Sequence, residues 1–289
     1  MKVPTVSVII PFFNGGRFLD GLMATLAAQT YRDFEIIIVN DGSTEQASLN
    51  ALQKLGSTAR VIDQENRYLP GARNTGFREA RAEFVLPLDQ DDRLEPSFLA
   101  ETLSVLREAP ADVGFVYTYM RFAGAISGIY VSRFDPFTQL FMNYLPYCML
   151  IRKSAWAAVH GYNEAMRDGS DDWDFSIRLA QAHYRGVEIA KPLFIYTVSP
   201  DGMLLSKSAR MVGTIFRQLK KEHRSLYRLP VLIAQWWSTN RSLASALRAV
   251  AFLTLTTVLP EHWFNVLYFQ LNILVRWWHV ARGARSMGT

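Results

Sequence analysis

Residues 83–92 read Glu-Phe-Val-Leu-Pro-Leu-Asp-Gln-Asp-Asp, an apolar run that ends in three carboxylates within four positions. The apolar part, Glu83–Leu88, predicts a buried strand. Neighbouring carboxylates raise one another's pKa unless a cation lies beside them. Oxygen ligands suit Mg²⁺ or Mn²⁺, so Asp89, Asp91 and Asp92 form a candidate metal site. A solvated acidic turn is the alternative.

Two earlier apolar runs, Val6–Ile10 and Phe34–Val39, also predict buried strands. Helices are predicted at 18–29, 44–55, 71–82 and 96–108, and further strands at 60–63, 113–120 and 147–151. This alternation predicts an α/β fold with a mostly parallel sheet flanked by helices. Ligands of such sheets bind beyond the carboxyl ends of the strands. Pro11, Asp41 and Asp89 follow three such ends and are expected to face one crevice.

The sequence Asp171-Asp172-Trp173-Asp174 opens another predicted helix. Acidic residues in a first helical turn are favoured by the helix dipole. Three carboxylates in four positions exceed that need, so this helix start is a second candidate functional element.

The composition describes a folded protein: the chain has 289 residues, of which 49% are apolar and 20% charged. Its one cysteine, Cys148, excludes an internal disulfide, fits a reducing compartment and is expected in the core. The apolar N-terminus lacks the features of a signal peptide. The sequence contains no repeat, no glycine-rich phosphate loop and no pattern of His and Cys typical of a zinc site.

Charge divides the chain into two predicted parts, residues 1–205 and 206–289. From Leu205 onward there are twelve Lys/Arg and two acidic residues, against nineteen and twenty-four before it. A basic C-terminal region favours an anionic partner surface. Nucleic acid is not expected, because no reader motif accompanies the basic residues.

The C-terminal region is predicted to be helical at 207–228, 231–237, 243–260 and 263–278. Its uncharged runs of 12 and 13 residues, 249–260 and 263–275, fall short of the roughly 20 needed to span a bilayer. A wide apolar face bordered by tryptophan and arginine predicts a helix lying on a membrane surface. The residues concerned are Trp263, Trp277, Trp278, Arg276, Arg282 and Arg285. Packing against residues 1–205 or against a second copy of the chain is the alternative.

Residues 6 to about 200 resemble an inverting family-2 glycosyltransferase with the GT-A fold, of the type that builds bacterial polysaccharides. The resemblance rests on segments that occur in the family's order and spacing, and it covers about two thirds of the chain. These segments are 6–14, 34–44, 71–76 (Gly-Ala-Arg-Asn-Thr-Gly), 86–92 and 171–179.

The resemblance implies a role for each matching residue. The nucleotide pocket is shaped by Pro11, Phe12 and Asn14, and the nucleobase, usually uracil, is read by Asp41. The base and diphosphate lie near Arg73 and Asn74, and the ribose and sugar near Asp89 and Gln90. The metal ligand is Asp91, for Mg²⁺ or Mn²⁺. Apart from the resemblance, the neighbouring Asp92 is expected to cap the following turn. The catalytic base is Asp172, with Asp171 as the alternative because it stands where the family usually has Glu.

Two features depart from the family pattern. The run 197–202, directly after Ile195-Tyr196, contains no basic residue, so Lys207 or Arg210 is expected to contact the diphosphate, or its binding is looser. Trp173 is expected either to line the acceptor site or to pack in the core.

The expected activity is transfer of a sugar, with inversion, from a nucleotide diphosphate, UDP by expectation, to a hydroxyl. A metal offsets charge on the leaving group, and one distant carboxylate takes the acceptor's proton. The expected place is the cytoplasmic face of the membrane, and the expected acceptor is lipid-linked or a growing glycan. A homo-oligomer is a further expectation.

The alternative is a non-catalytic subunit that binds nucleotide sugars or carbohydrate. A hydrolase would not need Asp41, and a nucleotidyltransferase would need a glycine-rich phosphate loop.

Overall fold

The computed structural model describes residues 2–199, 211–239, 242–260, 262–267 and 270. The strands are β1 (Val6–Phe12), β2 (Phe34–Asp41), β3 (Arg60–Gln64), β4 (Phe84–Pro87), β5 (Arg93–Leu94), β6 (Val113–Gly124), β7 (Gly128–Tyr130), β8 (Met149–Arg152) and β9 (Arg185–Val198). The helices are α1 (Gly16–Ala27), α2 (Gln46–Gln53), α3 (Tyr68–Glu79), α4 (Phe98–Glu108), α5 (Pro136–Gln139), α6 (Lys153–Ala158), α7 (Asp171–Gln181), α9 (Val212–Glu222), α10 (Leu229–Ser238) and α11 (Leu243–Val258).

One sheet contains all the strands in the order β3-β2-β1-β4-β8-β6-β9-β5, with β7 paired to β6, among the described residues. The first four strands of this order pair in parallel, as do β6 and β9. The strand β8 joins the two groups and runs antiparallel to β4 and β6. The expected α/β class and mostly parallel sheet are confirmed, and the antiparallel insertion of β8 is an addition.

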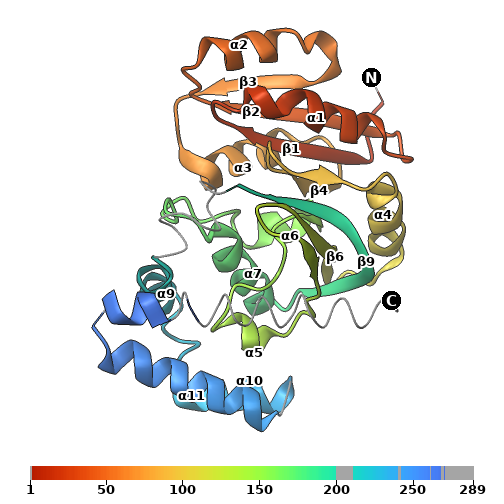
Figure 1. Cartoon of the computed structure of the whole chain (residues 1–289). Helices are drawn as coiled ribbons and strands as arrows, with labels where there is room; N and C mark the ends of the chain where they lie inside the picture. Colours follow the sequence, from red (N-terminus) through yellow and green to blue (C-terminus); the bar gives the residue numbers. More distant parts are fainter. Residues whose placement is uncertain (1, 200–210, 240–241, 261, 268–269, 271–289) are drawn as a thin grey trace.

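The parallel half of the sheet is covered on both faces. Every residue of β1 is buried, as expected of an uninterrupted apolar run inside a parallel sheet. Helix α1 buries Leu19, Leu22 and Leu26, which share one helical face. In Figure 1 the early elements form the upper part of the molecule, and the long strand β9 curls beneath them.

A second apolar cluster joins the C-terminal helices to α5 and α7. It contains Trp173 and Ile177 of α7 together with Phe216 of α9, Leu232 of α10 and Ala249 of α11. Figure 1 shows α10 and α11 below α5 and α7, and α9 to the left of α7. The C-terminal helices therefore share a core with α7. The predicted boundary at 205/206 lies outside the described residues.

Several element boundaries differ from the expected ones. Helix α3 begins at Tyr68, because Pro70 is tolerated in a first turn, where no helical partner exists for its missing N–H. Helix α4 begins at Phe98 and not at Pro96, whose carbonyl instead accepts a hydrogen bond from the Thr30 N–H. Strand β8 begins at Met149, two residues after the expected start.

The predicted C-terminal helices are present where the chain is described. Of the segment expected at 207–228, α9 covers 212–222, and α10 and α11 match the next two within a few residues. The last predicted helix, with Trp277, Trp278, Arg276, Arg282 and Arg285, lies mostly outside the described residues. Lys207 and Arg210 also lie outside them. Within the described ranges, each helix is too short or too polar to cross a bilayer.

Candidate active site

The ends of the parallel strands bring the first group of expected site residues together. Residues 11 and 12 of β1 pair with 39 and 40 of β2, and Asp41 pairs with Gln64 of β3. On the other side of β1, the Leu88 N–H donates to the Ile9 carbonyl, which continues the β4 pairing to the residue before Asp89. The parallel register thus places Asp41 and Asp89 at one edge of the sheet, as expected.

Asp41 is held by the neighbouring strand end. One carboxylate oxygen, Oδ1, accepts hydrogen bonds from Gln64 Nε2 at 2.6 Å and from the Arg67 backbone N–H at 2.8 Å. The side chain is buried. No hydrogen bond of the second oxygen, Oδ2, to another described residue is present, so it keeps its capacity to accept one from a ligand.

The loops after β1 and β4 are tied by a single side chain. Gln90 Oε1 accepts from the Phe13 N–H at 3.1 Å, and Gln90 Nε2 donates to the Phe13 carbonyl at 3.2 Å. The Phe12 side chain is buried in the core beside the buried Pro11. A contact of Phe12 with a nucleotide is therefore restricted to its backbone.

Asn14 fixes the start of the next loop. Its backbone is in the left-handed region, with φ of 48°. Its Oδ1 accepts from the backbone N–H groups of Thr44 and Glu45 at 2.8 and 3.0 Å. Asn14 thereby joins the loop after β1 to the loop after β2.

Arg73 of α3 joins the two acidic elements that the sequence singled out. Its Nη2 lies 2.8 Å from Asp89 Oδ1, and its Nη1 lies 2.7 Å from Asp171 Oδ2. Arg73 and Asp171 are each 2% exposed in their side chains, whereas Asp89 is 23% exposed. The pair of carboxylates holds the pKa of the guanidinium well above its ordinary value, against the opposing effect of burial.

Aromatic rings complete the surroundings of Arg73. The guanidinium carbon lies 4.8 Å from the centre of the Tyr147 ring and 5.5 Å from that of Tyr162, which are cation–π distances. The resemblance implies that Arg73 lies near the nucleotide base and diphosphate. In the structure its ionic contacts within the described chain go to protein carboxylates, so a direct contact with the diphosphate stays a prediction.

Asn74, like Arg73, makes its contacts with other protein groups. Its Nδ2 donates to the Tyr162 carbonyl and to Glu164 Oε1, and its Oδ1 accepts from the Tyr162 N–H and from Trp156 Nε1. These four contacts use its full hydrogen-bonding capacity. Asn74 thus connects α3 to the turn before α7, and its direct contact with a nucleotide also stays a prediction.

Asp92 does not have the capping role expected of it. Its side chain is buried, and it accepts from Tyr147 Oη at 2.6 Å and from the Thr197 N–H at 2.7 Å. The Tyr147 hydroxyl in turn accepts from the Asp89 N–H at 2.9 Å. Burial, together with the charges of Asp91 and Asp89, raises the pKa of Asp92 well above its ordinary value. The expectation of a cap was wrong, because this carboxyl anchors the acidic loop to β9.

Asp91 is the carboxylate that fits the expected metal. It is half-buried, and the one hydrogen bond recorded for its carboxylate among the described residues comes from its own backbone N–H. Burial and the neighbouring charge of Asp89 raise its pKa to about 6. A divalent cation would relieve this unfavourable charge. The described residues contain no cluster of three or more potential metal-binding side chains. Such a cation would therefore take most of its oxygens from a bound diphosphate, as Mg²⁺ sites do.

The two aspartates at the start of α7 have different surroundings. Ser170, with φ of 62°, turns the chain just before the helix. Asp171 points inward to Arg73, whereas Asp172 is partly exposed and its Oδ1 accepts from Asn143 Nδ2 at 3.1 Å and from the Trp173 N–H at 2.9 Å. Burial raises the pKa of the Asp172 carboxyl, and the Arg73 charge opposes that rise.

Trp173 packs in the core. It is 1% exposed, and its Nε1 donates to the Gln139 carbonyl at 2.6 Å. Of the two expected roles, the core role is confirmed and the acceptor-lining role was wrong. Cys148 is also buried in the core, as expected.

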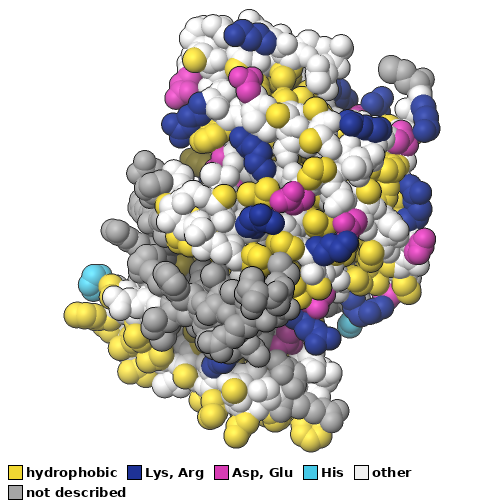
Figure 2. Space-filling model, turned by 45° about the vertical axis from the view of Figure 1, so that its right-hand side comes forward, with side chains coloured by type: hydrophobic (Ala, Val, Ile, Leu, Met, Phe, Trp, Pro, Cys, Tyr) yellow, Lys and Arg dark blue, Asp and Glu magenta, His cyan; other side chains and the backbone are white. Residues whose placement is uncertain are grey.

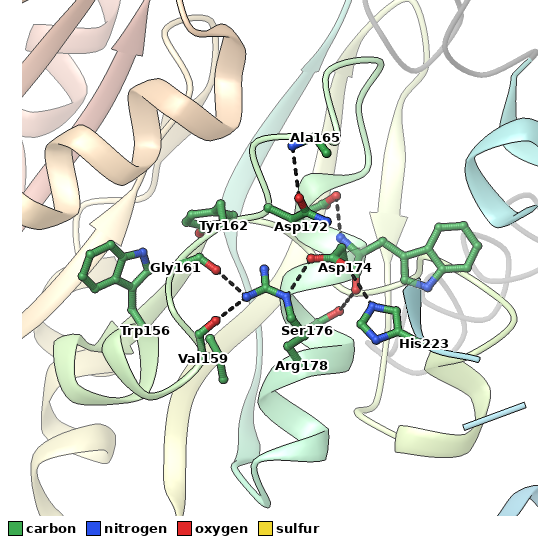
Figure 3. A network of polar contacts seen from close by, with 12 residues as sticks. Trp156, Val159, Gly161, Tyr162, Ala165, Asp172, Asp174, Ser176, Arg178 and His223 are labelled. Carbon is green, nitrogen blue, oxygen red and sulfur yellow. Dashed lines mark hydrogen bonds and ion pairs between the residues drawn. The ribbon is translucent and has the colours of Figure 1, made fainter. Parts of the chain in front are cut away.

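The third aspartate of α7 belongs to a separate polar network, shown in Figure 3. Asp174 accepts from Arg178 Nε at 2.7 Å, and Asp174 Oδ1 lies 2.8 Å from His223 Nε2. Arg178 also donates to the carbonyls of Val159 and Gly161. Because His223 directly follows α9, this network connects α7 to the C-terminal helices.

Four residues at the site were not anticipated from the sequence: Gln64, Asn143, Tyr147 and Thr197. Each supports an expected residue and carries no motif of its own. Tyr147 lies 55 residues from Asp92 and Thr197 lies 105 residues from it. Only the fold brings such partners together, so local sequence patterns offered no signal for them.

Comparison with known proteins places this fold and site in a family. The model of the family described as glycosyl transferase family 2 matches residues 7–171, more than half of the chain. The chain belongs to glycosyl transferase family 2. Glycosyltransferase GlyG of Streptococcus pneumoniae is 32% identical over 119 residues, which cover 39% of this chain and 40% of GlyG. The matches to the first curated relatives span less than half the length of those proteins.

Solved structures share the fold at low identity. The mannosyltransferase PcManGT of Pyrobaculum calidifontis, solved with GDP-Man and Mn²⁺, gives a TM-score of 0.57 at 17% identity over 95% of this chain and 87% of that chain. Residues 1–349 of TarS from S. aureus, solved with UDP-GlcNAc, give 0.55 at 17% identity, over 84% of this chain and 75% of that chain. Both support the GT-A fold.

Proposed function

We propose that this protein is an inverting glycosyltransferase that moves a hexose-type sugar from a nucleotide diphosphate, UDP by preference, to a hydroxyl acceptor. One observation carries the proposal. A single buried arginine, Arg73, connects the acidic loop after β4 to the acidic start of α7. A transferase needs a diphosphate site and a proton acceptor at a fixed separation. The contacts of Arg73 with both acidic elements would fix that separation.

The nucleotide is assigned to the ends of β1, β2 and β4. Asp41 is proposed to accept a hydrogen bond from the base through its second oxygen, and Asp89 and Gln90 are proposed to lie near the ribose and sugar. Pro11, Phe12 and Asn14 shape the pocket. Structural neighbours solved with UDP-GlcNAc and with GDP-Man support a nucleotide-sugar ligand of this fold.

Asp91 is proposed to hold Mg²⁺ or Mn²⁺ together with the diphosphate. The bound metal would offset the negative charge that develops on the leaving group. The fit rests on the half-buried carboxylate and on the repulsion from Asp89 that a cation would relieve. Asp89 itself is already compensated by Arg73, which leaves Asp91 as the carboxylate available to the ion.

Asp172 is proposed as the catalytic base. It is partly exposed, its orientation is fixed by Asn143 and the Trp173 N–H, and burial raises its pKa. A raised pKa makes a carboxylate a better proton acceptor for a hydroxyl. Asp171 is proposed to position this helix start, because its carboxylate is bound to Arg73 and buried.

The acceptor is proposed to be a lipid-linked or growing glycan at the cytoplasmic face of the membrane. A chain that binds nucleotide sugars without turnover, as a subunit of a glycan-assembly complex, is the competing function. Release of UDP from a panel of UDP-sugars in the presence of Mn²⁺ separates the two. We expect release that rises with added acceptor. Tight binding of a UDP-sugar without any release over the panel would favour the non-catalytic function.

A further inference from the structure

Helices α10 and α11 carry apolar side chains on two sides. One side packs into the cluster around Phe216 through Leu232 and Ala249. The other side carries equally apolar residues that stay exposed. We call these the C-terminal apolar face; they are Leu229, Ile233 and Trp237 on α10 and Leu243, Leu247, Val250 and Val258 on α11, between 54% and 71% exposed.

The spacing places these residues on one side of each helix, with the exposed Thr254 between Val250 and Val258. Positions 229, 233 and 237 are four residues apart and lie on one stripe of α10, and positions 243, 247, 250 and 258 lie on one stripe of α11. Trp263, which follows α11 in the chain, is 61% exposed as well. Figure 2 shows hydrophobic side chains gathered along the lower margin of the molecule, where Figure 1 places these helices. Contiguous apolar surface of this kind marks an interaction site.

Positive charge borders the C-terminal apolar face. Lys221, Arg224 and Arg228 are exposed just before α10, and Arg248 is exposed on α11 between Leu247 and Val250. Within residues 211–239 and 242–260 the one acidic residue is Glu222. An apolar face with a basic border, carried by helices too short or too polar to span a bilayer, has the composition of an interfacial membrane-binding surface.

We propose that the C-terminal apolar face docks the protein on an anionic phospholipid bilayer. The charge distribution favours this occupant over a second copy of the chain. In a two-fold dimer a surface meets itself, so the basic border would face another basic border. Anionic headgroups instead complement it, and the aliphatic stem of Arg248 can lie along the apolar side chains while its charge reaches the headgroups.

The docking surface is mechanically connected to the proposed catalytic helix. Trp173 and Ile177 of α7 share a core cluster with Leu232 and Ala249, and the Asp174–His223 contact adds a buried polar link. Docking would therefore hold the start of α7 in a fixed relation to the bilayer. This last point rests on the proposed function, whereas the docking itself does not.

Co-sedimentation with vesicles tests the proposal on the full chain. We expect binding to vesicles of phosphatidylglycerol and phosphatidylcholine, and weak binding to phosphatidylcholine alone. Replacing Ile233 and Leu247 together by Ser should weaken binding by roughly tenfold or more. Arg224→Gln and Arg228→Gln should each weaken it roughly fivefold, with a smaller effect at high salt.

Control substitutions away from the C-terminal apolar face test whether any loss of vesicle binding is specific to that face. Val3→Ser removes a similarly exposed apolar side chain far from the face, and Arg107→Gln removes an exposed charge on α4; neither should alter binding. Asp172→Asn should bind vesicles like the parent chain, so failure of catalysis and failure of docking are distinguishable. Absence of binding to anionic vesicles would overturn the proposal. So would a stable dimer in solution that Ile233→Ser and Leu247→Ser dissociate while vesicle binding is unchanged.

Discussion

Arg73 and Asp171 form a buried ion pair, 2.7 Å between Nη1 and Oδ2, across 98 positions of sequence. The same guanidinium also binds Asp89. One cation thus compensates two carboxylates from distant parts of the chain: Asp89, which lies after β4, and Asp171, which begins α7. Breaking a buried pair of this kind leaves charge without a partner, which is costly.

Replacement of Arg73 by Met should destabilise the protein by about 3–5 kcal/mol, because Asp171 would be left as an isolated buried charge. Urea denaturation measures the change. The matched control is Arg185→Met, which breaks the exposed pair with Asp112 and should leave stability nearly unchanged, because solvent screens that pair. Equal costs for the two variants would contradict the central role of Arg73.

The two aspartates that begin α7 should respond differently to conversion to Asn. Asp172→Asn should keep nucleotide binding and stability while sugar transfer falls by about 10²–10⁴-fold, the usual contribution of a general base. Asp171→Asn should lower stability by about 3–5 kcal/mol, because it leaves the buried Arg73 charge undercompensated. Transfer assays and denaturation curves measured side by side check both. Transfer at the parent rate by Asp172→Asn would move the base elsewhere.

Asp91→Asn should weaken the metal-dependent part of nucleotide binding. Thermal unfolding of the parent chain with UDP should shift upward as Mn²⁺ is added, because a ligand of the folded state stabilises it. The variant should need roughly tenfold more Mn²⁺ for the same shift. Asp20→Asn, which alters an exposed carboxylate on α1, is the control. The same Mn²⁺ dependence in Asp91→Asn and the parent would remove Asp91 from the metal site.

Tyr147→Phe should cost about 1–3 kcal/mol, because the hydroxyl both donates to the buried Asp92 and accepts from the Asp89 N–H. The substitution should also loosen the loop that carries Asp91 and weaken UDP binding. Tyr119→Phe removes a partly exposed hydroxyl from β6 and should change stability by less than about 0.5 kcal/mol. Calorimetric titration with UDP and urea denaturation measure the two effects.

The contribution of Asp174 to the stability of the fold should depend on pH. Hydrogen bonding with His223 and the charge of Arg178 hold its pKa below the ordinary value, although burial alone would raise it. Because the folded-state pKa is the lower one, this stabilisation is complete above about pH 4 and is lost as the pH falls through the folded-state value. Asp174→Asn should therefore cost about 1.5–3 kcal/mol at pH 7. The difference from the parent should narrow near pH 3; a constant difference across this range would be the opposite result.

Local pattern predicted the strand ends and the helix starts, and it therefore predicted which residues gather at the site. Uninterrupted apolar runs such as Val6–Ile10 can only be buried, and a cluster such as Asp171-Asp172 stands out at any helix start. The partners of those residues were not predictable in the same way. Arg73 and Tyr147 act through contacts set by strand order, in particular by the insertion of β8 between β4 and β6, which no local period encodes.

The packing of the C-terminal helices could likewise not be predicted from local sequence pattern. Their existence followed from apolar periodicity, but both sides of α10 and α11 are apolar, so the pattern alone did not tell which side packs on α7. Packing decided it, because Leu232 and Ala249 fit the cluster around Phe216 and Leu247 does not reach it.

The side-chain amide of Gln90 also restricts how this sequence can vary. A Cβ added at Gly15 would come within 2.1 Å of Gln90 Oε1, the atom that accepts from Phe13. Positions 15 and 90 are therefore not independent. A larger residue at 15 would be tolerated only with a shorter or reoriented one at 90, and the pair should change together among related sequences.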